Sequence, residues 1–135
     1  MADGAAQATE THGLLRVLLV DDDPDMRSLL EIMLSEDGRF AVVGHASDGA
    51  EAVRLGITRR PDVVVLDLQM PGMDGLTALP LLRERLPAAR IVVVSAFPDP
   101  LTLADAMQRG VDGYIDKSRT WCELLPTLEG LCALV

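Results

Sequence analysis

Short, unbroken apolar runs recur at nearly even intervals along the chain. They begin near residues 14, 40, 63, 90 and 113, which places them 26, 23, 27 and 23 residues apart. Valine, leucine and isoleucine dominate these runs, a pattern typical of strands buried on both faces. Segments with a helical period lie between them. Strands that alternate with helices predict a doubly wound α/β fold, with a parallel sheet, helices on both faces and right-handed crossovers.

The first predicted helix is the best marked, because both of its ends carry capping signals. Asp23 can cap the N-terminus, Pro24 fits the first helical position and Gly38 suits the stop. Its apolar positions form one stripe that is expected to face the core, namely Met26, Leu29, Leu30, Met33 and Leu34.

Three more helices are predicted over about residues 48–59, 76–86 and 100–109. Pro61 blocks continuation of the first of these, and Gly110 closes the last. Inward positions are expected at Ala50, Val53 and Ile57 in the first, and at Leu76, Leu79, Leu82 and Leu86 in the second.

Two prolines fall inside predicted helices, where a proline removes a backbone hydrogen bond and crowds the carbonyl four residues back. Pro80 is expected to be tolerated near the first turn of its helix. The last helix begins at about Trp121 and contains Pro126, so a kink or a late start is expected there.

Length and charge narrow the classes of function. The 135 residues suit one domain, predicted to span residues 14–135 behind a flexible tail over residues 1–13. A net charge of −9 argues against binding to a nucleic-acid backbone or to an anionic membrane. No stretch approaches the roughly 18–20 apolar residues of a membrane span, and the first dozen residues lack a secretory signal pattern. A cytoplasmic location is therefore expected.

The cysteines, and the histidine of the predicted domain, give no sign of disulfide or metal chemistry. Cys122 and Cys132 lie ten residues apart in one predicted helix, about 15 Å along its axis, which is too far for a disulfide. Neither has a histidine or another cysteine at metal-ligand spacing. His45 falls in the second predicted strand and is expected to be a packed or edge residue.

Four predicted strands end in polar side chains of complementary chemistry. Residues 21–23 are all aspartate and follow the first strand, Asp67 ends the third, Ser95 ends the fourth and Lys117 follows the fifth. The carboxyl ends of parallel strands share one edge of the sheet, which is where α/β proteins place ligands. These side chains are therefore expected to converge on one site.

Their chemistry suits phosphoryl transfer assisted by a divalent cation. Mg²⁺, or Mn²⁺ in its place, prefers oxygen ligands, and adjacent carboxylates supply them. Asp67 is placed to act as a nucleophile that forms an acyl-phosphate. Lys117 can pair with the phosphoryl oxygens, and the Ser95 hydroxyl can hydrogen-bond one of them. A contact made only in the phosphorylated state is what a switch requires.

The motifs at these strand ends resemble those of the response-regulator receiver domains of two-component signalling, which are bacterial phosphoproteins. Residues 20–24 (VDDDP) resemble the family's acidic pocket, and residues 65–75 (VLDLQMPGMDG) resemble its phosphoacceptor segment. Residues 94–96 (VSA) resemble the switch-hydroxyl motif, and residues 113–117 (GYIDK) resemble the segment with the switch aromatic and the lysine. The resemblance implies five βα units with strand order 2-1-3-4-5.

Position by position, the resemblance assigns a role to each residue of the acidic site. It implies that Asp67 is the phosphoacceptor and also a ligand of the cation. Asp22 would bind the cation directly and Asp21 through water, while the backbone carbonyl of Gln69 would be a further ligand.

The resemblance also implies which residues respond to phosphorylation. Lys117 and Ser95 would hold the phosphoryl group as the other catalytic residues, and Tyr114 would turn inward when Ser95 moves toward it. Gln69 and Phe97 occupy positions that tune the dephosphorylation rate in the family. The domain would catalyse only its own phosphorylation and dephosphorylation, and it is not expected to be an enzyme with a separate substrate.

The expected partners follow from the same resemblance. A histidine kinase, or a small phosphodonor, would supply the phosphoryl group. The face made by the fourth helix, the fifth strand and the last helix would contact an output domain, an effector protein or a second copy of the chain. Ser118 follows Lys117 where many receivers have proline, which resembles the subclass often linked to helix-turn-helix output domains. Ser118 and Pro126 both bear on this output face and leave the phosphorylation chemistry intact.

Two alternatives belong to other classes of function. A metal-dependent aspartyl-phosphate phosphatase usually needs a second acid two residues after the nucleophile, where this chain has Gln69. It also needs a cap or a larger cleft, for which the chain has no spare length. The other alternative is a receiver-like interaction module that works without phosphorylation. The presence of Asp22, Asp67, Ser95 and Lys117 argues against it.

Overall fold

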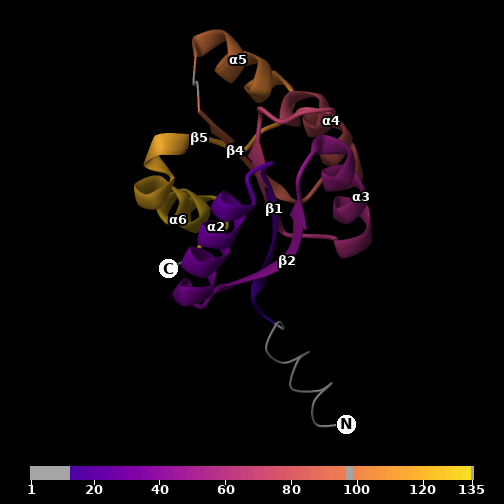
Figure 1. Ribbon diagram of the computed structural model, residues 1–135. Helices are drawn as coiled ribbons and strands as arrows, with labels where there is room; N and C mark the ends of the chain where they lie inside the picture. Colours follow the sequence, from indigo (N-terminus) through magenta and orange to yellow (C-terminus); the bar gives the residue numbers. More distant parts are fainter. Residues whose placement is uncertain (1–12, 97–98, 135) are drawn as a thin grey trace.

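The computed structural model describes residues 13–96 and 99–134 and has a five-stranded parallel sheet at its centre (Figure 1). The strands are β1 (Leu15–Val20), β2 (Phe40–Ala46), β3 (Val63–Asp67), β4 (Arg90–Ser95) and β5 (Gly113–Asp116). Their order across the sheet is β2-β1-β3-β4-β5, so the expected fold class and strand order are confirmed. The predicted tail falls almost wholly on residues 1–12, which lie outside the described residues.

Helices cover both faces of the sheet, as the alternation of patterns predicted (Figure 1). They are α2 (Pro24–Asp37), α3 (Gly49–Arg59), α4 (Gly75–Arg85), α5 (Pro100–Gln108) and α6 (Thr120–Leu131), with a short 3₁₀ helix, η1 (Lys117–Arg119), before the last. Helices α2 and α6 pack on one face of the sheet, and α3, α4 and α5 pack on the other. No helix in the described part of the chain is long and apolar enough to cross a membrane.

The caps of α2 lie where the sequence predicted them. The Asp23 carboxylate accepts from the amide of Asp25, and Gly38 ends the helix with a φ of 87°, a left-handed conformation that glycine adopts without strain. Leu30 and Leu34 are buried, but Leu29 is 48% exposed, so its place in the inward stripe was wrong. The face of α2 that reaches the sheet is narrower than the apolar stripe in the sequence.

The inward face of α3 also differs from the prediction. Ala50 and Ile57 are exposed, whereas Ala52 and Gly56 are buried. A Cβ atom at Gly56 would lie 3.1 Å from a methyl group of Leu82 in α4, which is a tight contact. The two helices therefore pack closely at a small residue of α3. The pattern of apolar residues does not predict this contact, because glycine does not count as an apolar position.

Both prolines lie inside continuous helices. Helix α6 runs from Thr120 through Pro126 to Leu131, so the expected late start was wrong. Pro80 lies in the second turn of α4 rather than the first, and it leaves the Leu76 carbonyl without the usual amide donor four residues on. The Arg109 guanidinium replaces the missing donor, because its Nη1 donates to the Leu76 carbonyl oxygen at 3.1 Å. A side chain at the end of α5 thus completes a hydrogen bond that α4 lacks.

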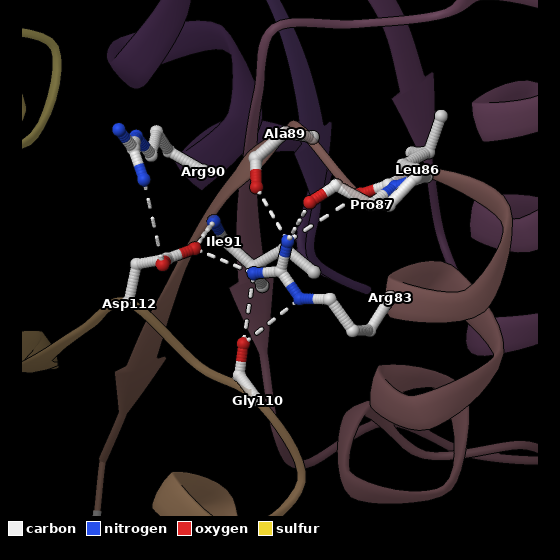
Figure 2. Close-up of polar contacts among 8 residues, drawn as sticks. All are labelled: Arg83, Leu86, Pro87, Ala89, Arg90, Ile91, Gly110 and Asp112. Carbon is white, nitrogen blue, oxygen red and sulfur yellow. Dashed lines mark hydrogen bonds and ion pairs between the residues drawn. The ribbon is translucent and has the colours of Figure 1, made fainter.

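At the amino-terminal edge of the sheet, Arg83 of α4 joins several connections (Figure 2). Its guanidinium donates to the carbonyl oxygens of Ala89 at 2.7 Å and Gly110 at 2.8 Å. It also pairs with the Asp112 carboxylate at 2.5 Å, which in turn accepts from the amide of Ile91 at 2.8 Å. One side chain therefore links the end of α4, the start of β4 and the turn before β5.

Candidate functional site

The polar strand-end residues come together at the carboxyl edge of the sheet, as predicted. Asp21 directly follows β1, Asp67 ends β3, Ser95 ends β4 and Lys117 directly follows β5. Asp21, Asp67 and Ser95 are buried, with 4%, 3% and 1% of their surfaces exposed, whereas Asp22 is exposed. The site is therefore a buried polar cluster that opens to solvent beside Asp22.

Lys117 bridges two of the carboxylates. Its Nζ lies 3.0 Å from Oδ2 of Asp21 and 3.3 Å from Oδ2 of Asp67. The turn that follows is held in place, because the Thr120 hydroxyl donates to the Lys117 carbonyl at 2.8 Å. The ammonium group offsets part of the carboxylate charge and lies where it can meet a group bound to Asp67.

The three carboxylates offer a set of ligands suited to a hard cation. One oxygen from each of Asp21, Asp22 and Asp67 can be chosen so that all lie within 4.8 Å of one another. Oxygen donors in a cluster that keeps access to water are what Mg²⁺ takes in proteins. The Gln69 amide donates to Oδ1 of Asp67 at 3.1 Å, which holds that carboxylate in place, while the Gln69 side chain is exposed.

Burial governs the ionisation of Asp67. Loss of contact with water raises the pKa of the Asp67 carboxyl, and the neighbouring charge of Asp21 raises it further, while the Gln69 amide and Lys117 oppose the shift. For Lys117, burial lowers the pKa, but its hydrogen bonds and charge interactions with Asp21 and Asp67 outweigh burial and raise the pKa overall. Extra positive charge at the site would therefore favour the ionised form of Asp67.

Gly75 allows α4 to start directly against the end of β3. A Cβ atom at Gly75 would lie 2.1 Å from the carbonyl oxygen of Asp67, so any residue other than glycine would clash with it. The Gly75 amide donates to the Leu68 carbonyl at 3.1 Å, and the Asp74 carboxylate caps the helix through the amide of Thr77 at 2.8 Å. The sequence predicted a helix from about residue 76, but it did not indicate this close contact between Gly75 and Asp67.

The residues expected to respond to phosphorylation are only partly placed by the structure. Ser95 is buried at the end of β4, and Tyr114 of β5 is partly buried against the core on the face of the sheet that α3, α4 and α5 cover. The Tyr114 hydroxyl is buried and has no hydrogen-bond partner among the described residues. Phe97, expected to tune dephosphorylation, lies outside the described residues.

Ser118 takes part in a compact turn after β5. Its amide and its hydroxyl donate to Oδ1 of Asp116, at 3.0 and 2.9 Å, and this carboxylate caps η1. No peptide bond between described residues is cis. The departure from proline therefore gives a capped 3₁₀ turn that carries Lys117 to the site.

Sequence reasoning missed Arg27 as a neighbour of the site. Its guanidinium donates from Nη1 to the Asp21 carbonyl and from Nε to Nδ1 of His45, at 3.3 Å for the latter. His45 lies half-buried on the edge strand β2, as expected, and also approaches Glu31 of α2. These contacts join α2 to β2, and neither segment carries a local pattern that indicates them.

Comparison with known protein families identifies the class of protein that the fold and the acidic site define. The response regulator receiver domain family matches residues 17–129, so the chain belongs to that family. Receiver domains of two-component response regulators are switches that phosphorylation activates, and this is the function of the domain. The comparisons favour neither alternative, since the family that matches is that of receiver domains.

Individual relatives agree with this family. The nitrate/nitrite response regulator protein NarL of Escherichia coli strain K12 is 38% identical over 117 residues, which cover 87% of this chain and 54% of NarL. The chain thus spans about half the length of that curated relative.

Two solved structures are similar in fold and related in sequence. A LuxR-family two-component response regulator from Aurantimonas sp. SI85-9A1 has a TM-score of 0.83 at 34% identity, covering 89% of this chain and 86% of its own. The CheX-CheY-BeF3-Mg+2 complex from Borrelia burgdorferi includes a chain with a TM-score of 0.82 at 26% identity, covering 91% of this chain and 98% of its own.

Proposed function

We propose that Asp67 is the residue that becomes phosphorylated. The observation that carries this proposal is the convergence of Lys117 with the carboxylates of Asp21 and Asp67, at 3.0 and 3.3 Å, beside the exposed Asp22. The position of Asp67 at the end of a buried strand, held by the Gln69 amide and by Lys117, fixes its carboxylate for attack.

The transfer step uses one oxygen of Asp67 as the nucleophile. That oxygen forms a bond to phosphorus while the bond from phosphorus to the leaving group breaks, which is the P–N bond of a phosphohistidine or the P–O bond of acetyl phosphate. The leaving group keeps the electron pair and takes up a proton if it needs one. Lys117 can follow the negative charge to the phosphoryl oxygens, and the Ser95 hydroxyl can donate to one of them.

Mg²⁺ is the proposed cofactor, and Mn²⁺ would serve in its place. Asp22 and Asp67 would hold it directly, Asp21 through water, and the Gln69 carbonyl would complete the protein's share. When bound, the cation supplies positive charge that neutralises the phosphoryl oxygens during transfer. The carboxylate cluster supports this choice because its donors are all oxygen and lie within 4.8 Å of one another.

A histidine kinase is the proposed phosphodonor, as in two-component signalling, and the output is a change of surface. We place the partner-binding face on α5, β5 and α6, because apolar side chains are exposed there. Leu101 is 83% exposed, Met107 56% and Trp121 51%. An output domain, an effector protein or a second copy of the chain would cover these side chains, while DNA would be contacted by an output domain rather than by this one. The match to a LuxR-family regulator supports an output domain in particular.

Intact mass spectrometry tests the assignment of Asp67. The chain is incubated with acetyl phosphate, with and without Mg²⁺, beside the variants Asp67→Ala and Asp62→Ala. Asp62 lies exposed at the opposite end of β3 and is the matched control carboxylate. We expect one phosphoryl group to be added in a Mg²⁺-dependent way to the wild type and to Asp62→Ala, and none to Asp67→Ala. A gain that persists in Asp67→Ala would refute the proposal.

A further inference from the structure

Arg27 lies where α2 and β2 meet the end of β1. Its Nη1 donates to the carbonyl oxygen of Asp21, and its Nε donates to Nδ1 of His45 at 3.3 Å. The ring hydrogen of a neutral His45 is therefore on Nε2, which lies 2.6 Å from Oε1 of Glu31. Arg27 and Glu31 are four residues apart, on the same face of α2, so the helix presents both to β2.

The carbonyl that Arg27 contacts belongs to the peptide unit that joins Asp21 to Asp22. A peptide unit is planar, so fixing its oxygen also fixes the direction in which the chain leaves Asp21 and the position of the Asp22 Cα atom. Asp22 is exposed, and packing does little to place it. The Arg27 contact is thus a restraint on the most exposed carboxylate of the acidic cluster.

The other polar groups of Asp21 are already engaged. Its amide donates to the Ala46 carbonyl at 3.0 Å, and its Oδ1 accepts from the Asp23 amide at 2.9 Å. Its Oδ2 faces Lys117 at 3.0 Å. With Arg27 on the carbonyl, every polar group of Asp21 has a defined partner, and the orientation of the Asp21–Asp22 peptide is set from the α2 side.

We propose that Arg27, His45 and Glu31 form a positioning chain that sets the Asp21–Asp22 peptide for binding of a divalent cation. This inference rests on the proposed function and adds a determinant of cation affinity to it. Arg27 is a positioning residue, because it contacts the backbone of a ligand residue rather than the cation or the phosphoryl group. Residues that orient metal ligands in this way typically change metal affinity by about 10–100-fold when replaced.

The charge of Arg27 and its positioning contact have opposite effects on the affinity for Mg²⁺. A positive charge near the site repels Mg²⁺, so removal of the charge alone would strengthen Mg²⁺ binding. Loss of the positioning contact would weaken it. Arg27→Lys keeps the charge and loses the fork that reaches two acceptors, so it isolates positioning. His45→Leu removes the acceptor for Arg27, and His45→Asn keeps an acceptor near the position of Nδ1.

The experiment measures the Mg²⁺ dissociation constant of the full chain by isothermal titration calorimetry, and the initial rate of phosphorylation by acetyl phosphate across Mg²⁺ concentrations. Arg85→Lys is the matched control, because Arg85 is exposed in the last turn of α4, away from the site. Thermal unfolding without Mg²⁺ reports on the fold of each variant.

We expect Arg27→Lys and His45→Leu to weaken Mg²⁺ binding about tenfold. At saturating Mg²⁺ both should recover a phosphorylation rate close to that of the wild type. His45→Asn should bind Mg²⁺ nearly as well as the wild type does, and Arg85→Lys should be unchanged.

The outcomes separate this inference from the proposed function. Wild-type Mg²⁺ affinity in Arg27→Lys and His45→Leu would overturn the positioning chain and leave the role of Asp67 intact. Weaker binding that His45→Asn fails to rescue, together with a lower unfolding temperature without Mg²⁺, would also overturn it, since that pattern belongs to a general loss of structure. A wild type that binds no Mg²⁺ would refute the cation site and the positioning chain together.

Discussion

When no cation is bound, the surroundings of Asp67 destabilise the ionised form of its carboxylate. It is 3% exposed and lies near the negative charge of Asp21, and burial raises its pKa first, with Asp21 adding to the shift. Lys117 and the Gln69 amide offset only part of this effect. The ionised Asp67 therefore lowers the stability of the folded state, while its carboxylate is desolvated and held in place for reaction. Such a loss of stability is common at functional sites.

Replacing Asp67 by asparagine should stabilise the protein in the absence of Mg²⁺. A raised pKa in the folded state means that ionisation favours unfolding, so the wild-type penalty is complete above the folded pKa and absent below the unfolded value of about 3.9. We expect Asp67→Asn to gain about 1 kcal/mol at pH 7, or a few degrees in Tm. Thermal unfolding in EDTA between pH 4 and 8 measures this. The gain should shrink toward pH 4, and a lower Tm at pH 7 would contradict the reasoning.

Residue by residue, the sequence identified the groups that carry the chemistry and missed one that places them. Asp21, Asp67, Ser95 and Lys117 follow directly from strand ends, because parallel strands bring those ends to one edge. Arg27 reaches Asp21 by the meeting of α2 with β1 and β2, which depends on how the helix is rotated over the sheet. That rotation is set by packing, and no local pattern encodes it.

At the scale of elements, strands were easier to predict than helix faces. The runs of valine, leucine and isoleucine have abrupt ends, and four of the five observed strands begin at the predicted residue, while β1 begins one residue later. Helix faces depend on neighbours. Ile57 was expected inside because it is apolar, yet α3 packs on α4 through Gly56, where a larger side chain would not fit without displacing Leu82.

Helices α4 and α5 are joined by a contact that Pro80 makes necessary. The Leu76 carbonyl has no amide donor at position 80, and Nη1 of Arg109 lies 3.1 Å from it. Arg109→Met should cost about 1–2 kcal/mol, because it leaves that carbonyl without this donor. In a Pro80→Ala background the backbone amide can supply the hydrogen bond, so the same change should cost about 1 kcal/mol less.

Urea unfolding of the four proteins in this cycle gives the coupling energy between Pro80 and Arg109. Asp105 is a built-in control, since it pairs with Arg109 through Nε at 2.8 Å on the surface of α5. Asp105→Asn should show no coupling to Pro80, because it leaves the Leu76 contact in place. Equal costs of Arg109→Met in both backgrounds would show that the helix tolerates the free carbonyl without help.

Across the whole molecule, the carboxyl edge of the sheet carries the acidic site and the amino-terminal edge carries contacts that stabilise the fold. The carboxyl edge gathers the carboxylates of Asp21, Asp22 and Asp67 beside Lys117, and the burial of Asp67 and its like charge with Asp21 oppose folding in part. The amino-terminal edge carries Arg83 and Asp112, whose side chains are 25% and 23% exposed, in a network that joins three connections (Figure 2). Strand β4 runs between these edges, from the Ile91 amide bound to Asp112 at one end to Ser95 at the other.

This division predicts that stability and phosphorylation can be changed separately. Arg83→Met leaves the carbonyls of Ala89 and Gly110 without their donor and Asp112 without its closest cation, so it should destabilise the fold by about 2–3 kcal/mol. Arg85→Met, at an exposed position on the same helix, should change stability by less than about 0.5 kcal/mol. Both variants should keep wild-type Mg²⁺ affinity and the same mass gain on Asp67 at temperatures where they are folded. Weaker Mg²⁺ binding by folded Arg83→Met would show instead that β4 transmits strain from one edge of the sheet to the other.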